Sequence, residues 1–323
     1  MNSTGQRCGI DNLAFRLVVA VMLTLLSFVT LRADNHRAVQ LPHLVLHLGQ
    51  DPDGRPTEQW LDAVRHFNDD EAIRAFAATH QALTPEQTDW FNLISSRLGD
   101  WQSRTAELAR PFADIQPPSS VDVLLGNIGG EDAFNPSDKL IAFDLGRLQA
   151  VYGPARDPGN ADRIGRFFAH EYTHVLHKIW RRDRGITIES PLEQALWGCL
   201  TEGLGNYRSL SARWHRADGR LSEHAEAVLA GLSPILVERL AALRTATDRE
   251  AAPLMRGLSM GPFEDKWGAL PVALWLSEEV RRDDDALGRW VERGPWGVLD
   301  LAAIYLPPDL ATKLPPKPNN SDE

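Results

Sequence analysis

The chain has little cysteine and no excess of positive charge. Its 323 residues include only Cys8 and Cys199, and Cys8 lies in an N-terminal leader, so the processed protein would hold no internal disulfide. Acidic residues (44) outnumber basic residues (34), and the formal net charge is −10. Proteins that bind nucleic acid usually carry a basic surface, so this composition argues against nucleic acid as a partner.

No apolar run in the chain has the length of a typical membrane span. The longest uncharged run, residues 17–31, follows Arg7 and Arg16 and precedes Ala33, which suits the position before a cleavage site. A membrane-spanning helix needs about 20 apolar residues, whereas the core of a signal peptide is shorter. We therefore expect residues 1–33 to be a signal peptide or, if uncleaved, an N-terminal anchor. The protein is then exported to the periplasm or the extracellular space and meets a membrane only through this segment.

Neither the second cysteine nor the glycine-rich segment of the chain suggests a catalytic role. Cys199 lies among apolar residues of a predicted helix, where a buried thiol is expected. Gly126, Gly129 and Gly130 do not have the G-x-G-x-x-G spacing of a phosphate-binding loop. We therefore expect residues 126–138 to form a hairpin or a loop at the rim of an active site.

One short motif carries chemistry. Residues 170–174 read HEYTH, which has the form HExxH, and they lie inside residues 161–182, which are predicted to form one helix. On a helix, His170 and His174 are one turn apart on the same face, so both imidazoles can bind one metal ion. Glu171 then lies beside them as a carboxylate base. This arrangement is typical of zinc hydrolases.

The sequence around the motif specifies the helix well. Asn160 is predicted as its N-cap, and Gly185 as its C-terminal stop. Apolar residues recur at steps of three and four and predict a buried stripe, formed by Ile164, Phe168, Tyr172, Val175 and Ile179. His170 and His174 lie on a different face of the helix.

A catalytic zinc ion needs a third protein ligand, and two acidic residues compete for this role in the helix predicted at residues 190–214. Glu193 and Glu202 are nine residues apart and therefore point to opposite sides of a helix. Residues 190–193 (SPLE) form a capping box, which gives Glu193 a structural role. Glu202 lies in the middle of the helix beside small residues, where an acid has no capping role. We therefore predict Glu202 as the third ligand.

These residues together resemble a known family. HEYTH, followed by Glu202 within residues 200–207 (LTEGLGNY), is similar to the gluzincin branch of the zincin metallopeptidases, and the resemblance covers roughly residues 120–280. It implies that His170, His174 and Glu202 bind Zn²⁺ and that Glu171 is the general base. It also implies a zincin-like domain in which the strand before the zinc-binding helix pairs with an extended peptide, near residues 142–145.

The groups around this centre are less well defined by the sequence. Some gluzincins have an Asp one turn after the ligand Glu that orients a zinc-bound His; here Asn206 holds that position, and its carbonyl can accept a ring N–H. His177 lies on the same stripe as the two ligand histidines, so it either supports the site or contacts substrate, or it faces solvent or makes a hydrogen bond elsewhere. No electrophilic group is indicated. The candidates by residue type alone are Tyr152, Tyr305, His215 and His224.

The rest of the chain predicts an α+β, mostly helical fold with a small β-sheet before the zinc-binding helix. Strands are expected at residues 39–48, 121–125 and 140–143, and further helices at residues 59–67, 71–79, 84–109, 221–243 with a break at Pro234, and 271–280. Residues 117–120 (PPSS) are the best candidate for an internal boundary, because the composition shifts there from helical to β-like. The expected organisation is a leader (1–33), a mostly helical region (34–118), a zincin-like domain (119–306) and a mobile tail (307–323).

Three functions fit this sequence. The first is a zinc-dependent peptidase that acts on peptide or protein substrates. The second is a zinc hydrolase that cleaves a non-peptide amide or ester. The third is a non-catalytic exported binding protein, although a protein that only binds has no need of Glu171. We expect the peptidase.

Overall fold

The computed structural model describes residues 42–318, which belong to one compact unit formed by residues 40–323. The leader expected at residues 1–33 lies outside the described residues. The boundary expected after residue 118 falls inside the compact unit. Within the described part of the chain, no helix is both long enough and apolar enough to cross a membrane.

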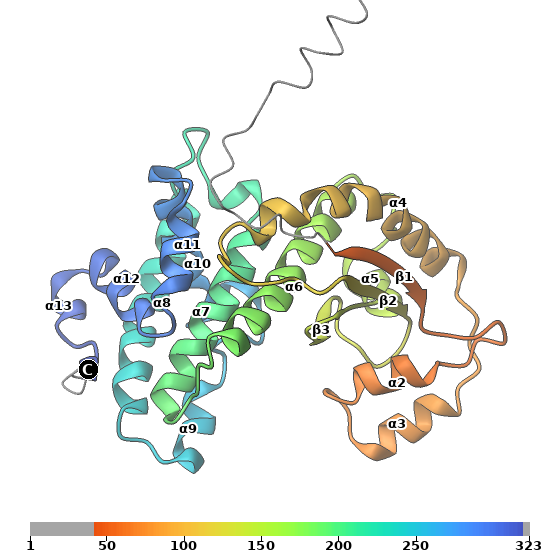
Figure 1. The fold of residues 1–323 in the computed structure, drawn as a ribbon, viewed down its shortest axis with the longest axis horizontal. Coiled ribbons are helices and arrows are strands. Elements are labelled where there is room, and N and C mark those ends of the chain that lie inside the picture. Colours follow the sequence, from red (N-terminus) through yellow and green to blue (C-terminus); the bar gives the residue numbers. More distant parts are fainter. Residues whose placement is uncertain (1–41, 319–323) are drawn as a thin grey trace, which may run out of the picture. The chain divides into compact units, whose positions relative to one another are not determined.

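A mixed four-stranded sheet forms one part of this unit (Figure 1). Its strands, in spatial order, are β1 (His43–Leu48), β2 (Ser120–Gly126), β4 (Leu140–Asp144) and β3 (Phe134–Ser137). β1 and β4 both run parallel to β2, whereas β3 is antiparallel to β4. β1, the strand expected at residues 39–48, lies at one edge of the sheet beside β2.

Both faces of this sheet are covered, and the strands show the corresponding alternation. Val123 of β2 and Ile141 of β4 pack into the large core beneath α4 (Pro85–Ala109) and α6 (Asn160–Asp183). The next residues, Leu124 and Ala142, point the other way, into a smaller core under α2 (Glu58–Val64) and α3 (Asp70–Ala77). Figure 1 shows α4 on one side of the sheet and α2 and α3 on the other. Successive side chains of a strand point to opposite faces, so both faces bury apolar residues.

The sheet differs from the expectation at its third and fourth strands. β2 and β4 are parallel and therefore cannot form a hairpin. The hairpin instead joins β3 to β4 through a turn at residues 138 and 139, so only its first strand lies within residues 126–138. β4 has neighbours on both sides, where Ala142 is paired with Leu124 and with Phe134. The expectation that a peptide pairs with β4 near residues 142–145 is therefore wrong at Ala142, because β3 and not β4 is the edge strand. The short strand β3 is not recognisable by period, because Pro136 lies within it.

The helix α6 that carries the HExxH motif confirms most of its predicted features. All five residues of the predicted stripe are buried against the sheet and α4, and Gly185 follows the helix with a φ of 62°. The predicted N-cap is wrong by one residue, because Gly159 holds the cap position. The Asn160 side chain instead donates hydrogen bonds to the carbonyls of Tyr152 and Pro154, at 3.2 and 2.9 Å. It thereby ties the helix to the end of α5 (Leu145–Tyr152).

The helix α7 (Pro191–Ser209) packs between α6 and α10 (Ala269–Arg282). It begins with the predicted capping box, in which the Glu193 carboxylate accepts from the Ser190 N–H at 3.1 Å and the Ser190 hydroxyl accepts from the Glu193 N–H at 3.2 Å. A Cβ at Gly203 would lie 2.4 Å from Val272 of α10. The absence of a side chain at Gly203 therefore sets how closely α10 approaches.

The remaining helices complete the helical part of the molecule (Figure 1). They are α8 (Glu223–Leu243), α9 (Asp248–Met255), α11 (Ala286–Glu292), α12 (Gly297–Tyr305) and α13 (Pro308–Ala311), with 3₁₀ turns at Ala212–Trp214 and Phe263–Asp265. α8 continues through Pro234, so the predicted break is absent. The segment after residue 307 is not a free tail throughout, because α13 packs on α8 and Leu314 packs against the core.

Candidate metal centre

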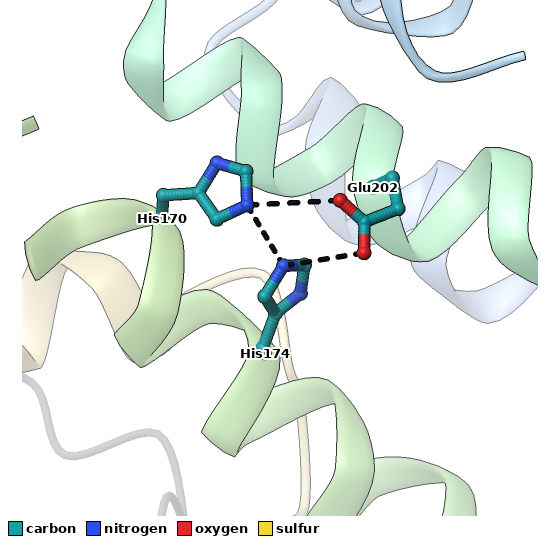
Figure 2. Close-up of side chains that lie close together, drawn as sticks. All are labelled: His170, His174 and Glu202. Carbon is teal, nitrogen blue, oxygen red and sulfur yellow. Dashed lines mark hydrogen bonds and ion pairs between the residues drawn. The ribbon is translucent and has the colours of Figure 1, made fainter. Parts of the chain in front are cut away.

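Three side chains from α6 and α7 converge at one point (Figure 2). The Nε2 atoms of His170 and His174 are 2.8 Å apart, and the Glu202 carboxylate oxygens lie 3.8 Å from the first and 3.7 Å from the second. One ligand atom of each residue lies within 4.8 Å of the others, which is close enough for all three to hold a single metal ion. The structure thus brings together the three residues that the sequence singled out. It leaves Glu193 at the start of α7, where it caps the helix.

A glycine shapes the position of the first histidine. Gly205 of α7 faces His170, and a Cβ at Gly205 would lie only 2.8 Å from the His170 Nε2 atom. Real side chains essentially never approach so closely, so the imidazole occupies the space that a larger residue would fill. On its other side, the His170 Nδ1 atom is 3.0 Å from the hydroxyl oxygen of Ser209. The ring is therefore held between α6 and the last turns of α7.

Both histidines are neutral in this environment. Burial is the main cause that lowers the pKa of His170 well below its ordinary value, and the neighbouring His174 lowers it further. Burial also lowers the pKa of His174, although the Glu202 carboxylate partly opposes this effect. A neutral imidazole has a free lone pair, which is the form that binds a metal. Two neutral histidines and a carboxylate offer the nitrogen and oxygen ligands that divalent transition metals accept.

The spacing of the three groups also fits a metal ion. Two nitrogen ligands at about 2.0–2.1 Å from a tetrahedral ion lie about 3.3 Å apart. The observed Nε2 to Nε2 distance of 2.8 Å is slightly shorter, and the distances to Glu202 are slightly longer. Small rotations of these three side chains would therefore bring their ligand atoms to the spacing of a tetrahedral site. Glu202 makes no hydrogen bond in residues 42–318 that would hold its carboxylate elsewhere.

Glu171 lies beside the three ligands and is not one of them. Its Oε1 atom is 4.0 Å from the His170 Nε2 atom, and the residue is only 7% exposed. Burial raises the pKa of Glu171 well above its ordinary value, and the negative charges of Glu202 and Asp132 raise it further. A divalent cation at the cluster would oppose this effect by favouring the carboxylate form. A carboxylate with a raised pKa is a stronger base than an ordinary Glu.

The two expected supporting residues behave differently. His177 is fully buried, so it does not face solvent; its Nδ1 atom is 3.0 Å from the hydroxyl oxygen of Thr201, and its ring stacks on Trp197. Asn206 is 1% exposed, yet its side-chain nitrogen has no hydrogen-bond partner within residues 42–318. Ser209, three residues further along α7, contacts His170 instead. No sequence signal pointed to Ser209, because a serine near a helix end is common.

The four candidate electrophiles are each engaged in other contacts. Tyr152 donates a hydrogen bond to Asp132, and Tyr305 donates one to Glu279 at 2.7 Å. His215 is 2.7 Å from the Ser277 hydroxyl, and His224 is 3.2 Å from Glu264. Of these four, only Tyr152 is linked to the centre, because its partner Asp132 is close enough to Glu171 to raise the pKa of that carboxyl.

Two lysines near the centre were not singled out by sequence reasoning. The charges of Lys178 and Lys266 both lower the pKa of His174 and of Glu171, so both ammonium groups lie near the cluster. Lys178 is anchored, with its Nζ atom 2.8 Å from the carbonyl oxygen of Asn135 in β3. The Lys266 ammonium group makes no hydrogen bond or ion pair within residues 42–318, and its Nζ atom lies 5.4 Å from the centre of the Phe263 ring.

The fold explains how Lys266 reaches this place. Lys266 lies three residues before α10, and its carbonyl accepts a hydrogen bond from the Leu270 N–H at 3.0 Å. A Cβ on the next glycine, Gly268, would lie 2.7 Å from the sulfur of Cys199, one turn before Glu202 on α7. The segment before α10 therefore packs directly on the ligand-bearing helix. Nothing in the local sequence around Lys266 indicates this, because the contact joins segments more than 60 residues apart.

Comparison with protein-family models, with curated proteins and with solved structures found no match for this chain. The geometry and chemistry of the centre are therefore the basis for inferring its function.

Proposed function

We propose that the protein is a zinc-dependent hydrolase, and specifically a peptidase of the gluzincin type with a zincin-like fold. The observation that carries this proposal is the convergence of His170, His174 and Glu202 beside the buried carboxyl of Glu171. Two histidines and one glutamate are a ligand set of catalytic zinc sites. When bound, zinc would polarise the substrate carbonyl and lower the pKa of a water molecule.

Glu171 is the general base in this proposal. It lies next to the three ligands but is not required to bind the ion, so its carboxylate is free to accept a proton from the attacking water. It then delivers that proton to the leaving amine, and no covalent intermediate with the protein is needed. Burial keeps water molecules other than the nucleophile from competing for the same carboxylate.

Lys266 is the group that stabilises the negative charge on the carbonyl oxygen in the transition state. It is the cation near the cluster whose ammonium group makes no hydrogen bond or ion pair within residues 42–318. Lys178 is less suited to this role, because Asn135 already accepts its hydrogen bonds. A positive charge placed before the reaction needs no reorganisation as the oxyanion forms.

The other two functions are weaker on the same observations. A non-catalytic binding protein has no use for a buried carboxyl at the cluster, and the Glu171 side chain makes no hydrogen bond within residues 42–318 that would give it a structural role. A hydrolase of non-peptide amides or esters would share the same centre and differ only in the substrate. Peptides are preferred because of the resemblance of the HEYTH and LTEGLGNY segments to gluzincins.

Zinc analysis combined with a base substitution tests the proposal. The purified protein is expected to hold about one zinc ion per chain. Glu171→Gln should keep the zinc and the fold and lose at least a hundredfold in hydrolysis of a broad peptide library, since general-base catalysis contributes about 10²–10⁴-fold. Glu193→Ala is the matched control, because it removes an acid from α7 at the capping box and should leave zinc and activity unchanged. Metal-free protein, or undiminished activity in Glu171→Gln, would show that the proposal is wrong.

A further inference from the structure

A cavity of about 540 Å³ lies over the turn that joins α6 to α7. Its lining includes His177, Lys178 and Arg181 from α6, Ile186 from the turn, and Trp197 and Thr201 from α7. These two helices also carry the three metal ligands. None of the lining residues is itself a ligand.

Part of the cavity lining lies one helical turn or less from the metal ligands. Lys178 is one turn, about 6 Å along the axis, from the ligand His174, and the charges of Glu171 and Glu202 act on its ammonium group. Thr201 immediately precedes the ligand Glu202, and the 3.0 Å contact between the Thr201 hydroxyl and the His177 Nδ1 atom joins the two helices. The cavity is therefore placed on the same two helices as the centre, one turn further along them.

One part of the lining is apolar and aromatic. The imidazole of His177 stacks on the indole of Trp197, with ring centres 4.3 Å apart and planes inclined by 20°. His177 is uncharged there, because burial lowers its pKa to about 3. Ile186 packs beside them against the core. This surface suits a large apolar side chain, which would remove both itself and Trp197 from water.

The other part of the lining is basic, and two of its cations, Lys178 and Arg181, have no ion pair within residues 42–318. Asn135 accepts the hydrogen bonds of Lys178, so Arg181 is the cation with nitrogens left to bind a ligand. Arg182 pairs with Asp138 and Asp183, and Arg184, which lies outside the lining, pairs with Glu292 at 2.8 Å. Arg181 has no carboxylate within ion-pair distance in residues 42–318. Its Nε atom donates to the carbonyl of Ile186 at 3.2 Å, and its guanidinium lies 4.9 Å from the Trp197 ring centre. The remaining guanidinium nitrogens are free to bind a ligand, and a planar guanidinium matches a carboxylate.

We propose that this cavity is the substrate-recognition pocket and that it binds a large apolar side chain against Trp197 and Ile186, together with a neighbouring carboxylate on Arg181. The carboxylate is either the free C-terminus of the peptide or an acidic side chain next to the apolar residue. This inference rests on the proposed function in that it names the substrate class. Its test does not require hydrolysis.

Calorimetric binding to the zinc-loaded Glu171→Gln protein tests the pocket. The probes are N-acetyl-phenylalanine and its amide for a terminal carboxylate, and N-acetyl-Phe-Asp-amide and N-acetyl-Phe-Asn-amide for a side-chain carboxylate. At least one acid is expected to bind about tenfold or more tightly than its neutral partner, as a charge-assisted hydrogen bond provides. N-acetyl-glycine should bind about tenfold more weakly than N-acetyl-phenylalanine, because it buries no apolar side chain.

Two arginine variants locate the carboxylate. Arg181→Gln should remove the preference for the acid, and Arg181→Lys, which keeps the charge without the planar fork, should retain part of it. Arg184→Gln is the matched control outside the cavity and should leave the preference unchanged. If Arg181→Gln still prefers the acid, the carboxylate binds the metal and the proposed pocket is wrong. Equal binding of acid and amide by the Glu171→Gln protein would also contradict the pocket. If the parent protein hydrolyses peptides but shows no preference for the acid, the recognition pocket is refuted and the proposed peptidase activity is not. If the acid is preferred but no peptide is hydrolysed, the peptidase proposal is refuted and the pocket is not.

Discussion

At the residue scale, the metal centre depends on a residue that contributes no ligand atom. Gly205→Ala would place a methyl group 2.8 Å from the His170 Nε2 atom and force the imidazole away from His174 and Glu202. Residues that orient a metal ligand typically contribute about 10–100-fold to metal affinity. We therefore expect Gly205→Ala to weaken zinc binding by at least about tenfold. Competition with a chelator of known affinity measures this change.

A second glycine provides the control for this substitution. Gly99 lies inside α4, and a Cβ there would meet no atom within 4 Å. Gly99→Ala should raise the free energy of unfolding by about 0.5–1 kcal/mol, because alanine loses less conformational freedom in a helix. Its zinc affinity should equal that of the parent. If Gly205→Ala binds zinc as tightly as Gly99→Ala, the close packing of α7 on His170 does not position the ligand.

Lys266 has a proposed role that rests on its charge near the cluster rather than on a sequence motif. We expect Lys266→Gln to lower kcat about a hundredfold or more, as the loss of one oxyanion-stabilising donor does in other hydrolases, with little change in KM or zinc content. Lys266→Arg should recover part of the rate because it restores the charge. Lys313→Gln, an exposed lysine near the C-terminal end of the described chain, is the control. Equal kcat values for Lys266→Gln and Lys313→Gln would remove Lys266 from the mechanism.

At the element scale, the joint between α6 and α7 contains a buried histidine that makes stability depend on pH. Burial lowers the pKa of His177 from 6.5 to about 3 in the folded protein. Above pH 6.5, both the folded and unfolded states hold this histidine neutral and its contribution is constant. As the pH falls below 6.5, the unfolded state takes up a proton that the folded state cannot accept. The folded state therefore loses stability in this window, by up to about 1.4 kcal/mol per pH unit.

The variant His177→Gln removes this titration and keeps a polar group that can contact Thr201. Between pH 6.5 and about pH 4, its free energy of unfolding should fall less steeply than that of the parent. Urea unfolding of both proteins at several pH values, followed by circular dichroism, gives the two slopes. Other titrating groups contribute equally to both and cancel in the difference. Parallel curves would mean that protonation of His177 does not destabilise the joint.

At the scale of the whole molecule, the metal ion would connect the two halves of the helical part. Two ligands come from α6, which packs on the sheet, and the third comes from α7, which packs on α10. Because zinc binds only the folded arrangement, free zinc at a hundred times its Kd should stabilise the protein by about 2.7 kcal/mol. For a chain of this size, each kcal/mol raises Tm by about 2–4 °C.

Calorimetric melting with and without a chelator therefore measures the linkage. Removal of zinc should lower Tm by several degrees, and the His174→Ala variant should show a much smaller shift because its site has lost a ligand. Identical shifts in the parent and in His174→Ala would place the bound metal somewhere other than the cluster.

The sequence by itself determined the elements that depend on neighbouring residues. The capping boxes at Thr84 and Ser190 set the starts of α4 and α7, and the apolar stripe of α6 lies where its period predicts. The same local reasoning separated Glu202 from Glu193, because nine residues of helix turn the two carboxylates to opposite sides. These features follow from hydrogen bonds and side-chain spacing within one or two turns.

Only the tertiary structure decided which distant segments meet. Strand order cannot be read from a strand's own residues, so β4 was expected at an edge although β3 and β2 enclose it. Lys266 reaches the cluster, and Ser209 rather than Asn206 contacts His170, because of how α10 and α6 pack on α7. Such contacts depend on the shape of the packed helix surfaces. Gly203 and Gly205, for example, allow Val272 and His170 to approach α7 closely. No regular spacing of residues in the local sequence indicates that shape.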